Sequence, residues 1–373
     1  MANKTARLGD LATYINGYAF KPADWGDTGL PIIRIQDLTG NSYQLNRYDG
    51  EYPERIEVND GDVLISWSAS LGVYVWQRGK ALLNQHIFKV VFDKLPINKD
   101  YFVFAVEHKL AEMESKTHGA TMKHIVKKDF DGTTIPYPTS EKQAEIADHL
   151  RRITSIIDKQ TEQLLLLDQL VKSRFIELFG DQTANPYGWQ QTSIGACCTL
   201  KSGTSLPADK ENEGGTIPYV KVGDMNYPGN EQYITTSSRF VSEQTAGTGV
   251  FPVGTVVFPK RGGAIGTNKK RLTRLPICAD LNVMGVTAGR RLTPQYLMAY
   301  FDTVDLGTLN NGSSVPQINN KDIAPLLICI PPMALQEQFA AFVEQTDKSK
   351  LAVQKGLQEL EILKKSLMQQ YFG

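Results

Sequence analysis

Residues 141–180 read EKQAEIADHLRRITSIIDKQTEQLLLLDQLVKSRFIELFG, and residues 334–373 read ALQEQFAAFVEQTDKSKLAVQKGLQELEILKKSLMQQYFG. Neither stretch contains proline, and in each the apolar residues recur at alternating steps of four and three. A seven-residue apolar period that continues this far predicts a coiled coil rather than one face of a globular helix. The predicted packing residues are Ile146, Leu150, Ile153, Ile157, Leu164, Leu167, Val171 and Leu178 in the first helix, and Phe339, Val343, Val353, Leu357, Leu360, Leu367 and Tyr371 in the second.

Both stretches close a longer internal repeat. Residues 118–180 align with residues 311–373 without a gap, and residues 61–66 resemble residues 254–259. The chain is therefore predicted to be one unit written twice, over 1–180 and about 188–373. Identical residues in the alignment include Gly119 and Gly312, Ile125 and Ile318, Pro138 and Pro331, Gln143 and Gln336, and Phe179 and Phe372.

Each copy changes character once along its length. Short β-type runs come first, at Pro31–Ile35, Asp62–Ser66 and His86–Phe92, and Tyr101–Glu114 has helical spacing. A proline-bearing segment then leads into the long helix. The pattern predicts an α+β protein with two sheet-rich domains, at 1–140 and 181–333, each followed by a long helix, at 141–180 and 334–373.

The two long helices are expected to pair with each other. Residues 181–189 contain Pro186 and Gly188 and lead into the second domain, so the helices cannot form a tight hairpin. A two-fold relation between the copies then requires an antiparallel coiled coil with the domains at opposite ends. The alternative is a pair of separate amphipathic helices, each packed on its own domain.

Composition limits the class of protein. The 373 residues include 40 Lys and Arg against 40 Asp and Glu, four cysteines, and no C-x-x-C spacing. This excludes a disulfide framework and a cysteine-rich zinc site. No stretch approaches 18 apolar residues, so the chain is predicted to be cytoplasmic, with no membrane partner. A net charge of zero also argues against a nucleic-acid partner, because nucleic-acid-binding domains usually carry a basic excess.

The distribution of charge points the other way. No acidic residue lies between Asp62 and Asp93, or between Glu243 and Asp280, and the two windows overlap when the copies are aligned. A basic segment at the same place in both copies predicts a DNA-facing surface, and the alternative is a solvated basic hairpin in each. The candidate DNA-binding residues are Trp67, Ser68, Arg78, Lys80 and Lys89 in the first copy, and Lys260, Arg261, Lys269, Lys270, Arg271 and Arg274 in the second.

Motifs for catalysis are weak. The chain has no phosphate-binding loop, zinc-binding helix or nucleophile elbow, and no catalytic or metal-binding residue is predicted. Asp100, Glu107 and Lys109 have the residue types of a Mg²⁺-dependent nuclease, which is the alternative function, but their spacing is helical where that chemistry needs a strand. Asn185-Pro186-Tyr187 partly matches an adenine-methyltransferase motif, yet a turn is the expected reading.

The residues also resemble a known family. The motifs at 61–66, 119–125, 135–138 and Gln143, their second copies around 312–336, and the Phe-Gly ending of both helices resemble the specificity subunit of type I restriction–modification enzymes. The resemblance covers essentially the whole chain. It implies two target-recognition domains, each reading one half of a bipartite double-stranded DNA site, and a coiled coil that sets the gap between the halves.

The resemblance further implies a chain with no catalytic activity and no cofactor of its own. Two modification subunits would methylate adenine N6 with S-adenosylmethionine, and restriction subunits would use ATP and Mg²⁺ to translocate and cleave DNA in phage defence. A helix of about 38 residues spans roughly 57 Å, which is consistent with half-sites separated by an unread gap. A purely structural coiled-coil adaptor is a third hypothesis, and it leaves the two basic windows without a purpose.

Overall fold

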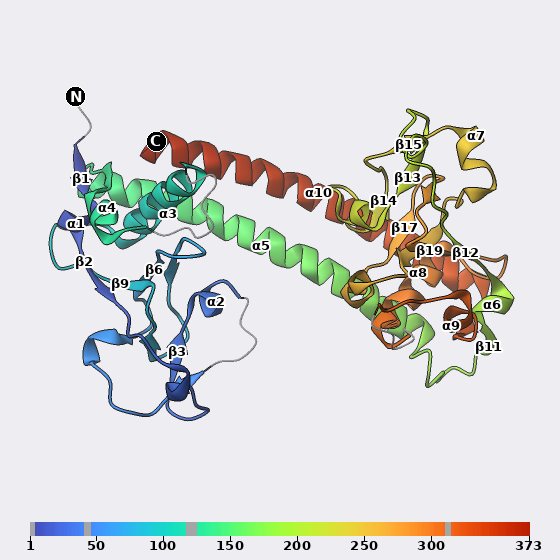
Figure 1. The fold of residues 1–373 in the computed structure, drawn as a ribbon, viewed down its shortest axis with the longest axis horizontal. Helices are drawn as coiled ribbons and strands as arrows, with labels where there is room; N and C mark the ends of the chain where they lie inside the picture. The colour runs from blue at the N-terminus through green and yellow to red at the C-terminus, as the bar shows by residue number, and fades with distance from the viewer. Residues whose placement is uncertain (1–3, 41–45, 117–124, 310–314) are drawn as a thin grey trace. The chain divides into compact units, whose positions relative to one another are not determined.

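The computed structural model describes residues 4–40, 46–116, 125–309 and 315–373. It divides into two compact units. Unit 1 comprises residues 1–162 and 354–373, and unit 2 comprises residues 163–353. Each unit therefore contains one sheet-rich domain together with one end of each long helix, and the same sheet–helix plan is built twice (Figure 1).

Unit 1 contains two four-stranded sheets and a strand pair. The larger core lies under an antiparallel sheet in the order β2-β9-β6-β7, and the second sheet has the order β4-β3-β8-β5. The strands are β1 (Thr5–Arg7), β2 (Thr13–Asn16), β3 (Leu30–Ile33), β4 (Arg47–Tyr48), β5 (Glu57–Val58), β6 (Val63–Ser66), β7 (Gly72–Val75), β8 (Ala81–Leu83), β9 (Ile87–Val91) and β10 (Thr134–Pro136). The helices are α1 (Leu8–Leu11), α2 (Ile35–Leu38), α3 (Lys99–Lys116) and α4 (Lys127–Gly132).

Unit 2 follows the same plan, with one more strand in its main sheet and one fewer in its second sheet. Its main sheet has the order β12-β19-β16-β17-β14, beside a three-stranded sheet β15-β13-β18 and the pair β11-β20. The strands are β11 (Gln190–Ser193), β12 (Cys198–Ser202), β13 (Ile217–Val220), β14 (Tyr233–Ile234), β15 (Phe240–Val241), β16 (Thr255–Pro259), β17 (Arg271–Thr273), β18 (Cys278–Ala279), β19 (Val283–Ala288) and β20 (Leu327–Ile330). The helices are α6 (Ile194–Cys197), α7 (Glu243–Ala246), α8 (Pro294–Thr303) and α9 (Asn320–Ile323).

The predicted elements of the first copy are present. The runs at 62–66 and 86–92 form β6 and β9, and the predicted helix at 101–114 forms the centre of α3. The run at 31–35 forms β3 but ends at Ile33. The Asp37 carboxylate accepts a hydrogen bond from the Arg34 backbone N–H at 2.8 Å, and this bond starts α2 at Ile35.

The long helices are α5 (Ser140–Phe179) and α10 (Met333–Phe372), of 40 residues each. In unit 1 the start of α5 shares a core with the end of α10, through Ile146 and Leu150 against Met368 and Phe372. In unit 2 the end of α5 shares a core with the start of α10. The helices therefore run antiparallel, and the alternative of two separate helices is wrong.

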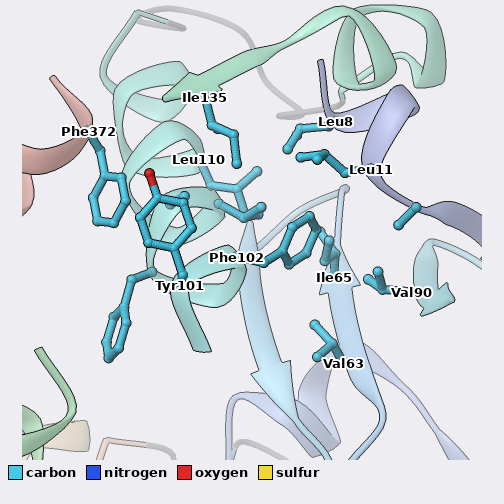
Figure 2. Close-up of a cluster of buried hydrophobic side chains, with 14 of the residues drawn as sticks. Leu8, Leu11, Val63, Ile65, Val90, Tyr101, Phe102, Leu110, Ile135 and Phe372 are labelled. Carbon is cyan, nitrogen blue, oxygen red and sulfur yellow. The ribbon is translucent and has the colours of Figure 1, made fainter. Parts of the chain in front are cut away.

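Each helix ends in the domain of the other copy. Phe372, at the end of α10, packs on Tyr101 of α3 with ring centroids 5.2 Å apart (Figure 2). Phe179, at the end of α5, packs on Tyr296 of α8 at 4.7 Å and 79°. Both tyrosine hydroxyls donate to a backbone carbonyl of the neighbouring strand pair, at Pro136 and Cys329 respectively. The repeated phenylalanines thus pack the end of each long helix against a domain in the same way.

The predicted packing residues lie on one face of each long helix. Ile146, Leu150, Phe339 and Val343 are buried, and the remaining predicted positions are half-buried. Leucines off that face, such as Leu165 and Leu351, are 60% and 68% exposed. The apolar row also contains Lys350, whose ammonium reaches the Asp168 carboxylate at 2.5 Å across the two helices.

Two buried glutamines form hydrogen bonds at the first turns of α5 and α10. Gln143 accepts a hydrogen bond from the Asn98 backbone N–H at 2.9 Å and donates to the Pro138 carbonyl at 3.0 Å. Gln336 makes the equivalent bonds to Thr293 N–H and the Pro331 carbonyl, both at 2.9 Å. Each glutamine satisfies backbone groups at the start of α3 or α8 and at the turn before its own helix, so the repeated residue has a repeated structural role.

Candidate nucleic-acid interface

One turn occupies the same structural position in both domains. In unit 1 it follows β6 and begins at Trp67, and in unit 2 it follows β16 and begins at Lys260. The backbone N–H of Ile125 donates to the Trp67 carbonyl at 3.0 Å, and the N–H of Ile318 donates to the Lys260 carbonyl at 2.9 Å. The two turns therefore descend from the same element of the repeat, and we call them turn 1 (residues 67–71) and turn 2 (residues 260–266).

Turn 1 is compact and carries no charge. The Trp67 indole stacks on Phe88 with centroids 5.5 Å apart and planes at 22°, and it meets His86 edge-on. Ser68, a predicted DNA-binding residue, is buried, at 8% exposure. Ala69 has a φ of +59°, which a turn this tight requires.

Turn 2 is polar and open. Gly262 has a φ of +74° and donates its N–H to the Pro316 carbonyl, and this bond directs the preceding Arg261 outward. The exposed Arg261 guanidinium donates through Nη2 to Gln317 Oε1 at 3.1 Å. Gln317 in turn donates to Asn319 Oδ1 at 2.7 Å, which fixes the amide orientation. Arg261 is thus held by one amide, and within the described residues its guanidinium makes no other side-chain hydrogen bond.

Two of the three predicted cations of the first copy are paired with acids from outside the acid-free window. Lys80 meets Glu57 at 2.8 Å, and Lys89 meets Asp62 at 3.3 Å. The hydrogen bond from Lys80 holds the pKa of Glu57 below its ordinary value. Arg78 lies over the Trp76 ring at 5.3 Å. The first window contains no acidic residue in the sequence, but an acidic side chain lies beside it in the structure. The pairing of β5 with β8 brings Glu57 next to Lys80.

Several cations of the second copy serve the fold. Lys270 is buried and donates to the Val304 carbonyl and to Asn268, and burial lowers its pKa. Arg271 donates to the backbone carbonyls of Asn230, Lys270 and Met225, and burial lowers its pKa as well. Lys270, a predicted DNA-binding residue, is thus buried and bonded within the domain.

The remaining cations of the second copy are only partly engaged. Lys269 donates to Asn226, and Lys260 donates to Ser202 Oγ at 2.9 Å. Arg274 is paired with Asp347 of α10 at 3.3 Å. Arg261 differs from these residues in that it is exposed on turn 2, and within the described residues its side-chain partner is the neutral Gln317. Gln317, which sequence reasoning missed, lies one residue before the repeated Ile318 and could have been found there.

The nuclease alternative does not fit the geometry. Asp100 and Glu107 lie on α3, seven residues apart, or roughly 10 Å along a helix, and one Mg²⁺ ion needs oxygens at about 2 Å. Glu107 pairs with Lys364 at 3.3 Å, and Lys109 pairs with Glu112 at 3.0 Å. No cluster of three or more His, Cys, Asp or Glu side chains that could hold a metal ion occurs among the described residues.

The Asn185-Pro186-Tyr187 segment is a turn, as predicted. Asn185 has a φ of +44°, and its side chain both accepts from the Trp189 N–H and donates to the Trp189 carbonyl, each at 2.9 Å. Its amide is therefore used locally and does not present the free groups that would hold a target base. In the described ranges, no helix is both long enough and apolar enough to cross a membrane.

Comparison with known proteins agrees with this plan. A family model for the type I restriction modification DNA specificity domain matches residues 2–167 and 186–362. The chain is 24% identical over 249 residues to the specificity subunit of the type I restriction enzyme EcoBI from Escherichia coli, covering 59% of this chain and 52% of that subunit. It is 20% identical over 377 residues to the MjaIX specificity subunit of Methanocaldococcus jannaschii, covering 92% and 86%.

The matches vary in how much of each relative they span. The chain spans about half the length of EcoBI and of the MjaVIII specificity subunit of M. jannaschii, at 52% and 45%. Among solved structures, the S subunit of the type I restriction-modification system from M. genitalium superposes with a TM-score of 0.60 at 14% identity, over 99% of this chain and 96% of that one. A chain from a study of type I R-M complex assembly and conformational transition gives 0.58 at 17% identity, over 99% and 97%. These structural likenesses establish the fold.

Proposed function

This chain belongs to the family of type I restriction modification DNA specificity domains, and from that premise we propose that it is the DNA sequence-recognition subunit of a type I restriction–modification complex. The observation that carries the proposal is the recurrence of one turn at one structural position in both domains, with different side chains in each. Two equivalent turns with different chemistry suit a target of two unlike halves. Domains 1–140 and 181–333 would each read one half.

The charge and exposure of turn 2 support direct reading of DNA. An arginine held at one side by an amide can present two donors to guanine O6 and N7, which is the commonest specific contact in the major groove. Turn 1 offers an indole and small side chains, which suit apolar contact with a thymine methyl group. Other lysines of the two windows, such as Lys80 and Lys269, would contribute to phosphate binding and position the domains on the backbone.

The long helices would set the gap between the half-sites. Forty residues at about 1.5 Å each give a helix of roughly 60 Å, and B-DNA advances roughly 34–36 Å per turn. A rigid antiparallel pair then selects half-sites at one separation. We therefore predict that a seven-residue insertion in α5 alone changes the gap or abolishes recognition.

Two modification subunits would bind equivalent helix surfaces. Leu170 and Leu363 are identical in the repeat and are 48% and 46% exposed, so packing inside this chain does not explain their identity. The exposed pairs Lys172 with Lys365 and Ser173 with Ser366 lie beside them. Because one sequence recurs on the exposed faces of both helices, it suits two copies of one partner. The chain would act in the cytoplasm, and its partners would supply S-adenosylmethionine, ATP and Mg²⁺ chemistry.

Mapping of N6-methyladenine tests the central proposal. The full chain is produced with the modification subunits of its host, and methylated adenines are mapped with and without this chain. We expect methylation that depends on the chain and falls in a motif of two short halves with an unread gap. Methylation that does not depend on the chain, or that falls in one uninterrupted motif, would contradict the proposal.

Partner stoichiometry tests the second part. We expect native mass spectrometry to find two modification subunits on the wild-type chain, one on Leu170→Asp or Leu363→Asp, and none on the double variant. Ile176→Asp is the matched control, because Ile176 is 47% exposed on α5 but aligns with Gln369 in the repeat. Loss of binding by the control variant would contradict the assignment of these surfaces.

A further inference from the structure

A carboxylate of α10 is bonded to the edge of the main sheet of unit 2. Asp347 accepts hydrogen bonds from Gln232 Nε2 at 3.0 Å and from the Tyr233 hydroxyl, and it pairs with Arg274 Nη2 at 3.3 Å. Its side chain is only 14% exposed. Three donors on one poorly solvated carboxylate form a stronger link than an exposed ion pair, because each bond is charge-assisted.

The three donors come from two neighbouring strands. Gln232 directly precedes β14, Tyr233 is its first residue, and Arg274 directly follows β17, which pairs with β14 in parallel. The Arg274 guanidinium lies over the Tyr233 ring at 3.8 Å from its centroid. Burial, together with the bond to Asp347, raises the pKa of Tyr233, so its hydroxyl remains a donor at neutral pH. The helix is thus bonded to the edge strand β14 and to Arg274, which follows the neighbouring strand β17.

The first copy lacks this link. The residue that aligns with Asp347 is Thr154, whose hydroxyl is buried and has no hydrogen-bond partner in the described part of the chain. The equivalent sheet of unit 1 has four strands, and its described residues include no counterpart of β14 beyond β7. In unit 1, the α3 side chains Asp100 and Glu107 reach the long helices through exposed ion pairs, which contribute little.

We propose that Asp347 is a positioning residue that fixes recognition domain 2 in one orientation on its helix, so that this domain accepts its half-site at one gap length only. The inference rests on the proposed function. A change of one base pair in the gap moves a half-site by roughly 3.4 Å and rotates it by roughly 35° about the duplex axis. A domain held on its helix by Asp347 as well as by the core around Phe339 and Val343 resists that movement more than a domain held by the core alone.

The test uses the full chain in complex with its modification subunits and a duplex library in which the mapped half-sites are separated by every gap within two base pairs of the natural one. For wild type, we expect methylation to fall on the order of 100-fold for each wrong gap, since a misplaced contact costs about as much as a mismatched base pair. For Asp347→Ala we expect a fall of no more than about tenfold for gaps one base pair away. Methylation at the natural gap should change much less.

Two further variants keep the test decisive if Asp347→Ala folds poorly. Tyr233→Phe removes one donor and leaves the carboxylate in place, so its gap tolerance should lie between wild type and Asp347→Ala. Glu344→Ala, an exposed carboxylate one turn earlier on α10, and Thr154→Val, the aligned position in copy 1, are matched controls that should retain wild-type gap selectivity.

The outcomes separate the two proposals. If the wild-type complex shows no sequence-dependent methylation, the proposed function fails. If wild type is selective and both Asp347→Ala and Tyr233→Phe retain the same single gap length, the positioning role of Asp347 is overturned while the proposed function stands. Equal relaxation by Thr154→Val would also overturn it, because the effect would then not be specific to unit 2.

Discussion

The two copies of the repeat pack the ends of the long helices against their domains in the same way. They differ in the side chains of the turn that we propose contacts DNA. Phe179 and Phe372 pack on equivalent tyrosines, and Gln143 and Gln336 make equivalent backbone bonds. The turns after β6 and β16 share a position but no chemistry. Positions that determine assembly have therefore stayed alike within this chain, and positions that meet DNA in our proposal have diverged.

The largest expected loss of stability comes from removing the phenylalanine that both copies have at the end of the long helix. Phe179→Ala and Phe372→Ala should each lower the free energy of unfolding by about 3–5 kcal/mol, because each removes a buried ring and leaves a cavity. Urea denaturation followed by circular dichroism measures the change. A loss below 1 kcal/mol in one copy, with a full loss in the other, would show that the two closures are not equivalent.

The buried glutamines should have the next largest effect. Gln143→Ala and Gln336→Ala each leave a buried backbone N–H and a carbonyl without a partner, at a cost of about 1–3 kcal/mol. Gln336→Ala should lower the free energy of unfolding more than Gln143→Ala does, because Gln336 Nε2 also donates to the Arg291 carbonyl at 3.0 Å. Chemical denaturation compares the pair, with Gln345→Ala on the exposed face of α10 as a control. The reverse order would mean that this extra bond is not formed in solution.

Substitutions of Arg261 test whether turn 2 reads a base in a way that turn 1 does not. Arg261→Ala should lower discrimination at one base pair of one half-site by about 1–3 kcal/mol and leave the other half-site unchanged. Arg261→Lys keeps the charge but not the two-donor fork, so it should restore affinity without restoring discrimination. Binding to a panel of single-substitution duplexes measures both. Uniform weakening across all sequences would instead identify Arg261 as a phosphate contact.

The smallest effect is expected at Glu107. Its ion pair with Lys364 is 45% and 23% exposed, so Glu107→Ala should change the free energy of unfolding by less than about 1 kcal/mol. The purified chain should not cleave DNA with Mg²⁺, before or after the substitution. Cleavage by the wild-type chain that disappears in Glu107→Ala would support the nuclease alternative. The difference between the two turns would then not explain the function of the chain.

Much of the fold was predictable from local pattern. The heptad spacing in 141–180 and 334–373 predicted two long helices to within a residue of where they begin, because burial along a helix follows a period that the sequence itself displays. The repeat predicted two equivalent domains. The end of β3 was missed, because one carboxylate, Asp37, starts a helix where the apolar run continues.

The candidate site was less predictable, because charge in space depends on strand pairing. Lys80 and Lys89 lie in a window without acids, yet Glu57 and Asp62 meet them across the sheet, and Lys270 is buried against α8's carboxyl end. Asp347 gave no signal at all, since its partners lie more than 70 residues away in the chain.

The amino-acid sequence by itself determined the duplication, the two helices and their packing faces, because each depends on periodicity and identity along the chain. Only the tertiary structure decided which cations remain exposed, which are consumed by the fold, and that one domain is fastened to its helix by Asp347 while Thr154 leaves the other without that bond. Hydrogen bonds and ion pairs join residues distant in sequence, so their partners exist only once the strands are paired and the helices packed.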